Sequence, residues 1–126
     1  MISFGFTGTR QGMTAEQKSA LRNFLDGGVG EFHHGDCIGA DSEAHDIADE
    51  CGYGIILHPP TNYSERAWRE VPRHMMRPER PYLDRNKDIV RETTWLIAAR
   101  QSQTNNYVLA HGRLFALRGS RESRCF

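Results

Sequence analysis

Two short glycine-rich turns carry the residues most suited to chemistry. The first, "FTGTRQGMT" at 6–14, follows an apolar opening, and the second, "GDCIGAD" at 35–41, follows a weaker apolar run. Glycine lets the backbone approach a ligand closely, and the first N–H groups of a helix are unpaired and partly positive. Threonine hydroxyls and the Arg10 guanidinium add further donors. Both turns therefore predict binding of a phosphate or carboxylate.

The second turn also contains two acids, Asp36 and Asp41. A simple phosphate cradle would not place carboxylates among its glycines, whereas carboxylates accept hydrogen bonds from ribose hydroxyls or a base. Two structural alternatives stay open. Asp41 has the residue type of a helix N-cap, and tight turns use glycine for its dihedral freedom alone.

The elements around these turns alternate between strand and helix. Apolar runs predict strands, and apolar residues at helical spacing predict helices, the first with a capping box formed by Thr14 and Gln17. The expected strands are 2–6, 29–34, 54–58 and 94–99, and the expected helices are 14–26, 40–51 and 81–93. This order predicts an α/β fold, a Rossmann-like open parallel sheet of four to five strands with flanking helices. Both turns would then lie at the carboxyl ends of the strands, where such sheets bind ligands.

Residues 61–80 are polar and rich in arginine, and we expect a long loop with one helical turn near Trp68. A flap over the ligand site is the favoured interpretation. Single-stranded DNA binding, with bases stacked on Trp68, is an alternative that we do not favour, because the 16 Lys and Arg of the chain balance 16 Asp and Glu. A self-association surface, and hence a homo-oligomer, is another alternative.

The sequence resembles the SLOG superfamily, which includes DNA-processing protein A and the Lonely guy phosphoribohydrolases. The resemblance rests on four motifs in order: "GFTGTRQGMT", "HHGDCIGADSEAHDIA", "HPP" and "PYLDRNKDIV". The resemblance covers residues 2–99 and implies a site for a nucleotide or nucleotide-derived small molecule. With His58, which ends a strand at the same edge, the expected ligand-binding residues are Gly8, Thr9, Arg10, Gly35, Gly39, Ala40, His58, Arg85 and Asn86. Tyr82 could add a ring there.

An enzymatic version would hydrolyse an N-glycosidic bond of a nucleoside monophosphate, which requires a carboxylate at the sugar carbon. The phosphoribohydrolase signature PGGxGTxxE is absent from the sequence, so Asp36 or Asp41 would have to serve as the catalytic residue. We therefore rank binding or sensing above catalysis, and a DNA-binding module like DNA-processing protein A third.

The chain departs from the family after residue 99. Members usually continue with a glycine-threonine turn and a further helix and strand, whereas residues 100–126 form a basic tail with little helical or strand period. With synonymous codons chosen freely, a neighbouring reading frame from Asn106 can spell LRSGTWATVRFARKPGKPVF, which contains such a turn. We therefore hypothesise a frameshift near residue 100, which the coding DNA tests directly. The tail would then pack poorly and leave one edge of the sheet uncovered.

The histidines and cysteines predict no metal or cofactor. His33 and His34, if on a strand, point to opposite faces and cannot both converge on one ion. Cys37 fits a small buried filler better than a nucleophile. Three cysteines without a CxxC pair predict a reducing, cytoplasmic setting, and no apolar stretch is long enough to span a membrane.

Overall fold

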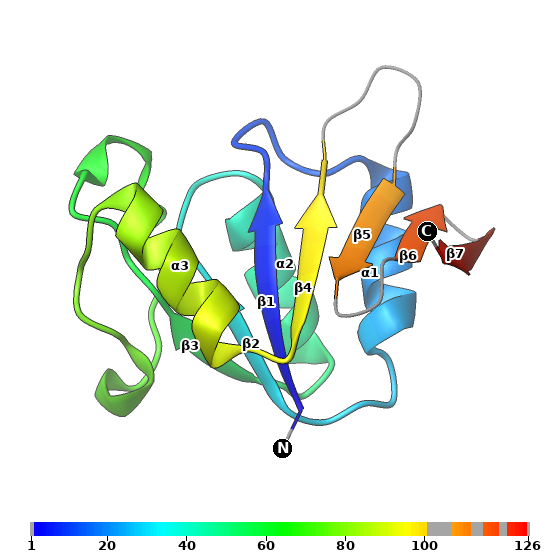
Figure 1. The fold of residues 1–126 in the computed structure, drawn as a ribbon, viewed down its shortest axis with the longest axis horizontal. Helices are drawn as coiled ribbons and strands as arrows, with labels where there is room; N and C mark the ends of the chain where they lie inside the picture. Colours follow the sequence, from blue (N-terminus) through cyan, green and yellow to red (C-terminus); the bar gives the residue numbers. More distant parts are fainter. Residues whose placement is uncertain (1, 101–106, 112–114, 119–120, 126) are drawn as a thin grey trace.

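The computed structural model describes residues 2–100 throughout and, beyond them, the backbone of 107–111, 115–118 and 121–125. Four strands alternate with three helices in the first hundred residues (Figure 1). Their bounds are β1 Ser3–Gly8, α1 Ala15–Leu25, β2 Glu31–His34, α2 Ala40–Glu50, β3 Gly54–Leu57, α3 Tyr82–Glu92 and β4 Trp95–Ala99. The predicted order of elements and the α/β class are confirmed.

The sheet begins with four parallel strands in the order β3-β2-β1-β4. The central strand β1 pairs with β2 on one side and with β4 on the other, where Gly8 lies opposite Ala99. The chain therefore winds outward from β1 to β3 and returns through α3 to β4 on the other side. In an open parallel sheet, such a reversal of strand order creates a crevice beyond the carboxyl ends of the strands.

The helices cover both faces of the sheet. In Figure 1, α3 lies in front of it, and α1 and α2 lie behind. The core lies between the sheet and the rear helices, where Phe6, Phe32 and Leu21 are almost completely buried. The predicted capping box of α1 is present, because Thr14 Oγ1 accepts from Gln17 N at 3.1 Å and Gln17 Oε1 accepts from Thr14 N at 3.0 Å.

The long segment after β3 contains two short 3-10 turns, Tyr63–Glu65 and Arg73–Met75. The first of them is the nearest counterpart of the helical turn expected near Trp68, whereas Trp68 itself adopts a left-handed conformation with φ 59°. The Arg66 guanidinium lies 3.9 Å from the centroid of the Trp68 ring, so a cation–π contact accompanies this conformation. Local side-chain contacts that sequence periodicity does not record therefore set the path of the loop.

Three antiparallel strands follow β4: β5 Tyr107–His111, β6 Phe115–Arg118 and β7 Arg121–Cys125. They extend the sheet to the order β3-β2-β1-β4-β5-β6-β7 (Figure 1). The expectation that the tail lacks strands and leaves the edge of β4 uncovered is therefore wrong. Among the helices of the described residues, none has the length and apolar character needed to cross a membrane.

Candidate functional site

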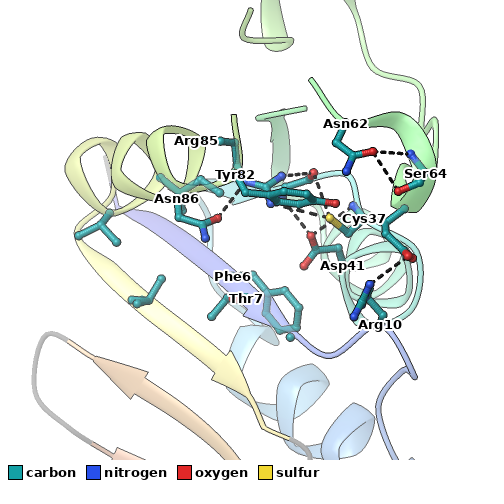
Figure 2. Close-up of a pocket in the computed structure, with 16 residues that line it drawn as sticks. Phe6, Thr7, Arg10, Cys37, Asp41, Asn62, Ser64, Tyr82, Arg85 and Asn86 are labelled. Carbon is teal, nitrogen blue, oxygen red and sulfur yellow. Dashed lines mark hydrogen bonds and ion pairs between the residues drawn. The ribbon is translucent and has the colours of Figure 1, made fainter. Parts of the chain in front are cut away.

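A cavity of about 500 Å³ opens at the carboxyl ends of β1 and β2. Both glycine-rich turns contribute to its wall, through Gly8 and Arg10 from the first and Gly35, Cys37 and Asp41 from the second. The opposite walls come from the segment 62–65 and from α3, whose Tyr82, Arg85 and Asn86 face the same space (Figure 2). Apolar side chains of α3 and β4 line one end: Ile89, Val90 and Leu96. The cavity thus combines a polar end with an apolar end.

The two turns are packed directly against each other. A Cβ added at Gly8 would lie 2.4 Å from Ala40 Cβ, and one added at Gly39 would lie 2.3 Å from the carbonyl oxygen of Arg10. The amide of Ala40 also donates to Thr9 O at 3.0 Å. Both glycines are therefore required for close packing of the two turns, and the dihedral freedom that the sequence left open as an alternative applies to Gly39, which has a φ of 84°.

We expect Gly39→Ala to lower the free energy of unfolding by roughly 2–4 kcal/mol, since it combines a φ of 84° with a backbone clash. Gly27→Ala is the matched control, because Gly27 has φ 75° but nothing within 4 Å of an added Cβ. The control should lose only about 1–2 kcal/mol. Urea unfolding measures both, and equal losses would show that the contact between the turns contributes nothing.

Asp41 is the most unusual group at the cavity. Its Oδ2 accepts from Gly35 N at 3.2 Å and from Cys37 N at 3.3 Å. Among buried side-chain nitrogens and oxygens of the described residues, Asp41 Oδ1 alone has no hydrogen-bond partner. Burial raises the pKa of this carboxyl to about 7, against the opposing effect of the Arg85 charge. The group can therefore accept or donate a hydrogen bond near neutral pH.

The N-cap alternative for Asp41 is wrong. The N-cap of α2 is Gly39, and no side chain caps the helix there. Asp41 lies two residues further on and folds back to accept from the preceding turn. Its carboxylate thus closes the turn 35–41 and occupies amides that a ligand anion would otherwise reach.

The side chain of Arg85, on α3, is buried against the second turn. Its Nη1 donates to Gly35 O at 2.5 Å and to His58 O at 3.0 Å, and its Nε donates to Asn86 Oδ1 at 2.9 Å. The guanidinium carbon lies 5.0 Å from the centroid of the Tyr82 ring. The guanidinium packs directly against Gly35, because an added Cβ there would lie 2.3 Å from Arg85 Nη1 and would displace the end of this side chain. Arg85 therefore supplies a fixed positive charge to the cavity wall.

Asp36 anchors the long loop and is not among the residues that line the cavity. Its Oδ2 accepts from Arg66 Nε and its Oδ1 from Arg69 N, both at 2.9 Å. The backbone of Asp36 is left-handed, with φ 55°, and its carbonyl accepts from Ala67 N at 2.8 Å. Arg66 also pairs with Glu79 at 2.6 Å. Asp36 thus holds the segment that forms the far wall.

The amides of the second turn are taken up within the chain. Besides the two that Asp41 accepts, Ile38 N donates to Glu65 O at 2.8 Å and Asp36 N donates to His34 Nδ1 at 3.0 Å. The expectation that these amides hold a ligand anion therefore differs from the structure. Among the residues that line the cavity, the side chains of Arg10, Arg85 and Asn86 also carry hydrogen-bond donors.

His58 lies behind the cavity wall. Its side chain contacts His33, with 2.8 Å between His58 Nε2 and His33 Nδ1, and only its carbonyl reaches Arg85. On the other face of the sheet, His34 Nε2 lies 2.9 Å from His45 Nδ1. His33 and His34 point to opposite faces, as predicted. Burial, followed by the charge of His33, lowers the pKa of His58 to about 4, so this imidazole is neutral at pH 7.

The structure brings six of the sequence-predicted residues together around the cavity: Gly8, Arg10, Gly35, Asp41, Arg85 and Asn86. Thr9, Asp36, Gly39, Ala40 and His58 lie outside the lining and support it through the contacts given above. Sequence reasoning did not identify Asn62, Ser64 and Glu65. Their position in the segment that leaves the carboxyl end of β3 was the available signal. Burial raises the pKa of the Cys37 thiol, which agrees with a filler role.

Fold and site together define an α/β protein with a Rossmann-like parallel sheet and a polar cavity at the carboxyl ends of its strands. Comparisons with models of protein families, with curated proteins and with solved structures find no significant match.

Proposed function

We propose that the chain binds a nucleotide or nucleotide-derived small molecule in the cavity between the two glycine-rich turns and α3. The observation that carries this proposal is the unpaired, buried Asp41 Oδ1 at a cavity that also holds two arginines. A buried oxygen without a partner is costly, and a ligand that donates a hydrogen bond to it would remove that cost. The resemblance to the SLOG superfamily supports the same class of ligand.

The cavity offers a separate environment for each part of a nucleotide. Asp41 and Asn86 suit sugar hydroxyls, and the Tyr82 ring with the apolar end suits a base. Arg10 suits a phosphate at the mouth, since its side chain is 61 % exposed and its Nη1 pairs with Glu65 Oε1 at 2.9 Å. An exposed ion pair of this kind is weak, so a phosphate can replace Glu65 as the partner of Arg10.

Arg10→Ala should weaken binding of nucleoside monophosphates at least about tenfold, because a charge-assisted hydrogen bond contributes roughly 1.5–3 kcal/mol. The measurement is thermal unfolding against a panel of nucleoside mono- and diphosphates. At a hundredfold excess over Kd, a true ligand stabilises the fold by about 2.7 kcal/mol. Arg22→Ala is the control, since Arg22 also pairs with a glutamate on the surface, Glu50, at 2.8 Å.

The proposal fails if no nucleotide in the panel stabilises the wild-type chain. It also fails if Arg10→Ala and Arg22→Ala respond equally to a nucleotide that does. Because both arginines are exposed, neither substitution should disturb the fold.

Hydrolysis of an N-glycosidic bond is the alternative that one observation favours. A carboxyl with a pKa of about 7 can give or take a proton near neutral pH, and Asp41 has this property at the cavity. Asp41 would then serve as the acid or base, whereas Asp36 is held by Arg66 and Arg69. Chromatography of a nucleoside monophosphate incubated with the protein would show free base if this alternative holds.

The arginines of the loop do not favour nucleic-acid binding. Arg66, Arg69 and Arg77 pair with Glu79, Asp46 and Glu92, respectively. The Trp68 ring, expected to stack on bases, already carries the Arg66 guanidinium on one face. A base stacked on that face would therefore compete with this contact.

A further inference from the structure

Two buried imidazoles meet on the face of the sheet that α3 covers, away from the cavity. His33 lies on β2 and His58 directly follows β3, and their side chains are almost completely buried. The distance from His33 Nδ1 to His58 Nε2 is 2.8 Å, and the ring centroids lie 5.1 Å apart. Neither side chain has a role in the proposed nucleotide site.

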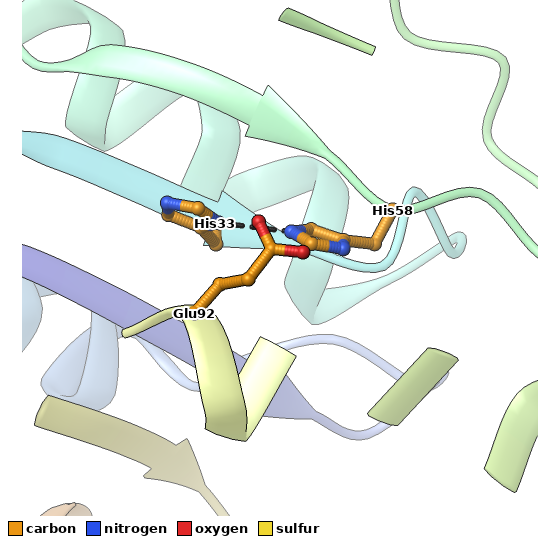
Figure 3. Close-up of side chains that lie close together, drawn as sticks. All are labelled: His33, His58 and Glu92. Carbon is orange, nitrogen blue, oxygen red and sulfur yellow. Dashed lines mark hydrogen bonds between the residues drawn. The ribbon is translucent and has the colours of Figure 1, made fainter. Parts of the chain in front are cut away.

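A carboxylate completes this cluster. Glu92 is the last residue of α3, and Figure 3 shows its side chain directed toward both imidazoles. One donor atom from each of the three residues lies within 4.8 Å of the others. The Glu92 side chain is 34 % exposed, so the cluster can be reached from solvent on that side. Its present partner is Arg77, at 2.9 Å from Nε to Oε1.

The geometry is close to that of a coordinated pair. Two nitrogens bound tetrahedrally to zinc at 2.0–2.1 Å would lie roughly 3.3 Å apart, so the imidazoles need to separate by only about 0.5 Å. His33 Nε2 lies 3.1 Å from Glu31 Oε1. With the proton on Nε2, the lone pair of His33 is on Nδ1 and faces His58. A carboxylate behind a histidine is the usual outer partner of a metal ligand.

We propose that His33 Nδ1, His58 Nε2 and the Glu92 carboxylate form a binding site for a divalent transition-metal ion of the zinc class, with the fourth position open to water. Two imidazoles, a carboxylate and one open position form a common ligand set of zinc sites. The site forms when His58 carries its proton on Nδ1 and Glu92 exchanges Arg77 for the metal. Because exposed ion pairs are weak, the loss of Arg77 as a partner of Glu92 lowers the metal affinity only slightly.

Titration of untagged protein with Co²⁺ tests this proposal, because tetrahedral cobalt absorbs strongly in the visible range. We expect one equivalent to bind, displaceable by Zn²⁺, with no thiolate-to-cobalt charge-transfer band. Glu92→Gln should weaken binding at least about tenfold. His58→Gln should abolish the visible spectrum. His74→Gln is the control, since His74 is an exposed histidine outside the cluster and should bind cobalt like the wild type.

Glu92→Gln decides the question even if His58→Gln fails to fold, because Glu92 is at the surface and its substitution should leave the fold intact. The proposal is overturned if Glu92→Gln binds cobalt as tightly as the wild type. It is also overturned if a thiolate band appears, if His74→Gln loses the ion, or if the wild type binds none.

Discussion

Asp41→Asn should raise the free energy of unfolding at pH 8 by up to about 4 kcal/mol and leave it nearly unchanged at pH 4. Burial raises the pKa of Asp41 from 3.8 to about 7. Between these values the folded chain holds a proton that the unfolded chain has released, so stability falls as pH rises through this window. Each pH unit corresponds to about 1.36 kcal/mol, and the loss is complete above pH 7. Asparagine removes this loss because it carries no charge.

The measurement is urea unfolding of both proteins from pH 4 to pH 8.5, compared as a difference at each pH. The difference isolates Asp41 from the histidines, whose lowered pKa values act in the opposite direction. Asp49→Asn, an exposed acid on the same helix, should show no comparable rise. A difference that does not grow with pH would contradict the buried, unpaired state of Asp41.

The same substitution should weaken nucleotide binding. The amide group keeps one oxygen for Gly35 N and Cys37 N but puts a donor where Oδ1 now lies. A ligand hydroxyl that donates to Oδ1 would then face an N–H group. More stability with less binding is the expected signature of a functional group kept at a cost to the fold.

Arg85→Ala should lower the free energy of unfolding by about 3–5 kcal/mol at pH 8. The substitution leaves the carbonyls of Gly35 and His58 without their donor. It also removes the positive charge that most strongly lowers the pKa of Asp41. At pH 5 the loss should be smaller, because Asp41 can remain protonated when its opposing charge is gone. Denaturant unfolding at the two pH values measures the change.

Arg91→Ala is the control for Arg85, since Arg91 lies on the same helix with a side chain that is 70 % exposed. It should change stability by less than about 1 kcal/mol. In an Asp41→Asn background, Arg85→Ala should cost less than in the wild type, because no buried charge remains to be compensated. An equal cost in both backgrounds would show that Arg85 and Asp41 do not interact.

The first hundred residues follow from sequence patterns because their elements are locally encoded. Apolar runs of strand length and a capping box at Thr14 fix the alternation of strands and helices without reference to distant residues. The strands β5 to β7 were missed because 107–125 has no regular alternation of apolar residues, which is the pattern that predicts a strand from sequence.

A cavity lies at the sheet edge that the glycine-rich turns predicted, but its hydrogen bonds were not predicted in detail. Two glycines, Gly8 at the end of β1 and Gly35 directly after β2, line this cavity, as the sequence predicted. The use of each amide depended on long-range acceptors, such as Glu65 O for Ile38 N, that no local pattern records. The contact between His33 and His58 joins residues 25 positions apart for the same reason. Nucleotide binding and the catalytic role of Asp41 remain predictions.

The contact between Gly8 and Ala40 also restricts which sequence changes this protein can accept during evolution. Because the two glycine-rich turns are in van der Waals contact, a larger residue in one turn requires a smaller residue in the other. Selection is expected to remove single substitutions there, whereas Ser64, whose exposed side chain lines the cavity, is expected to vary more freely. If the cavity binds a ligand as proposed, changes in ligand preference are therefore expected on the 62–65 segment rather than in the two turns.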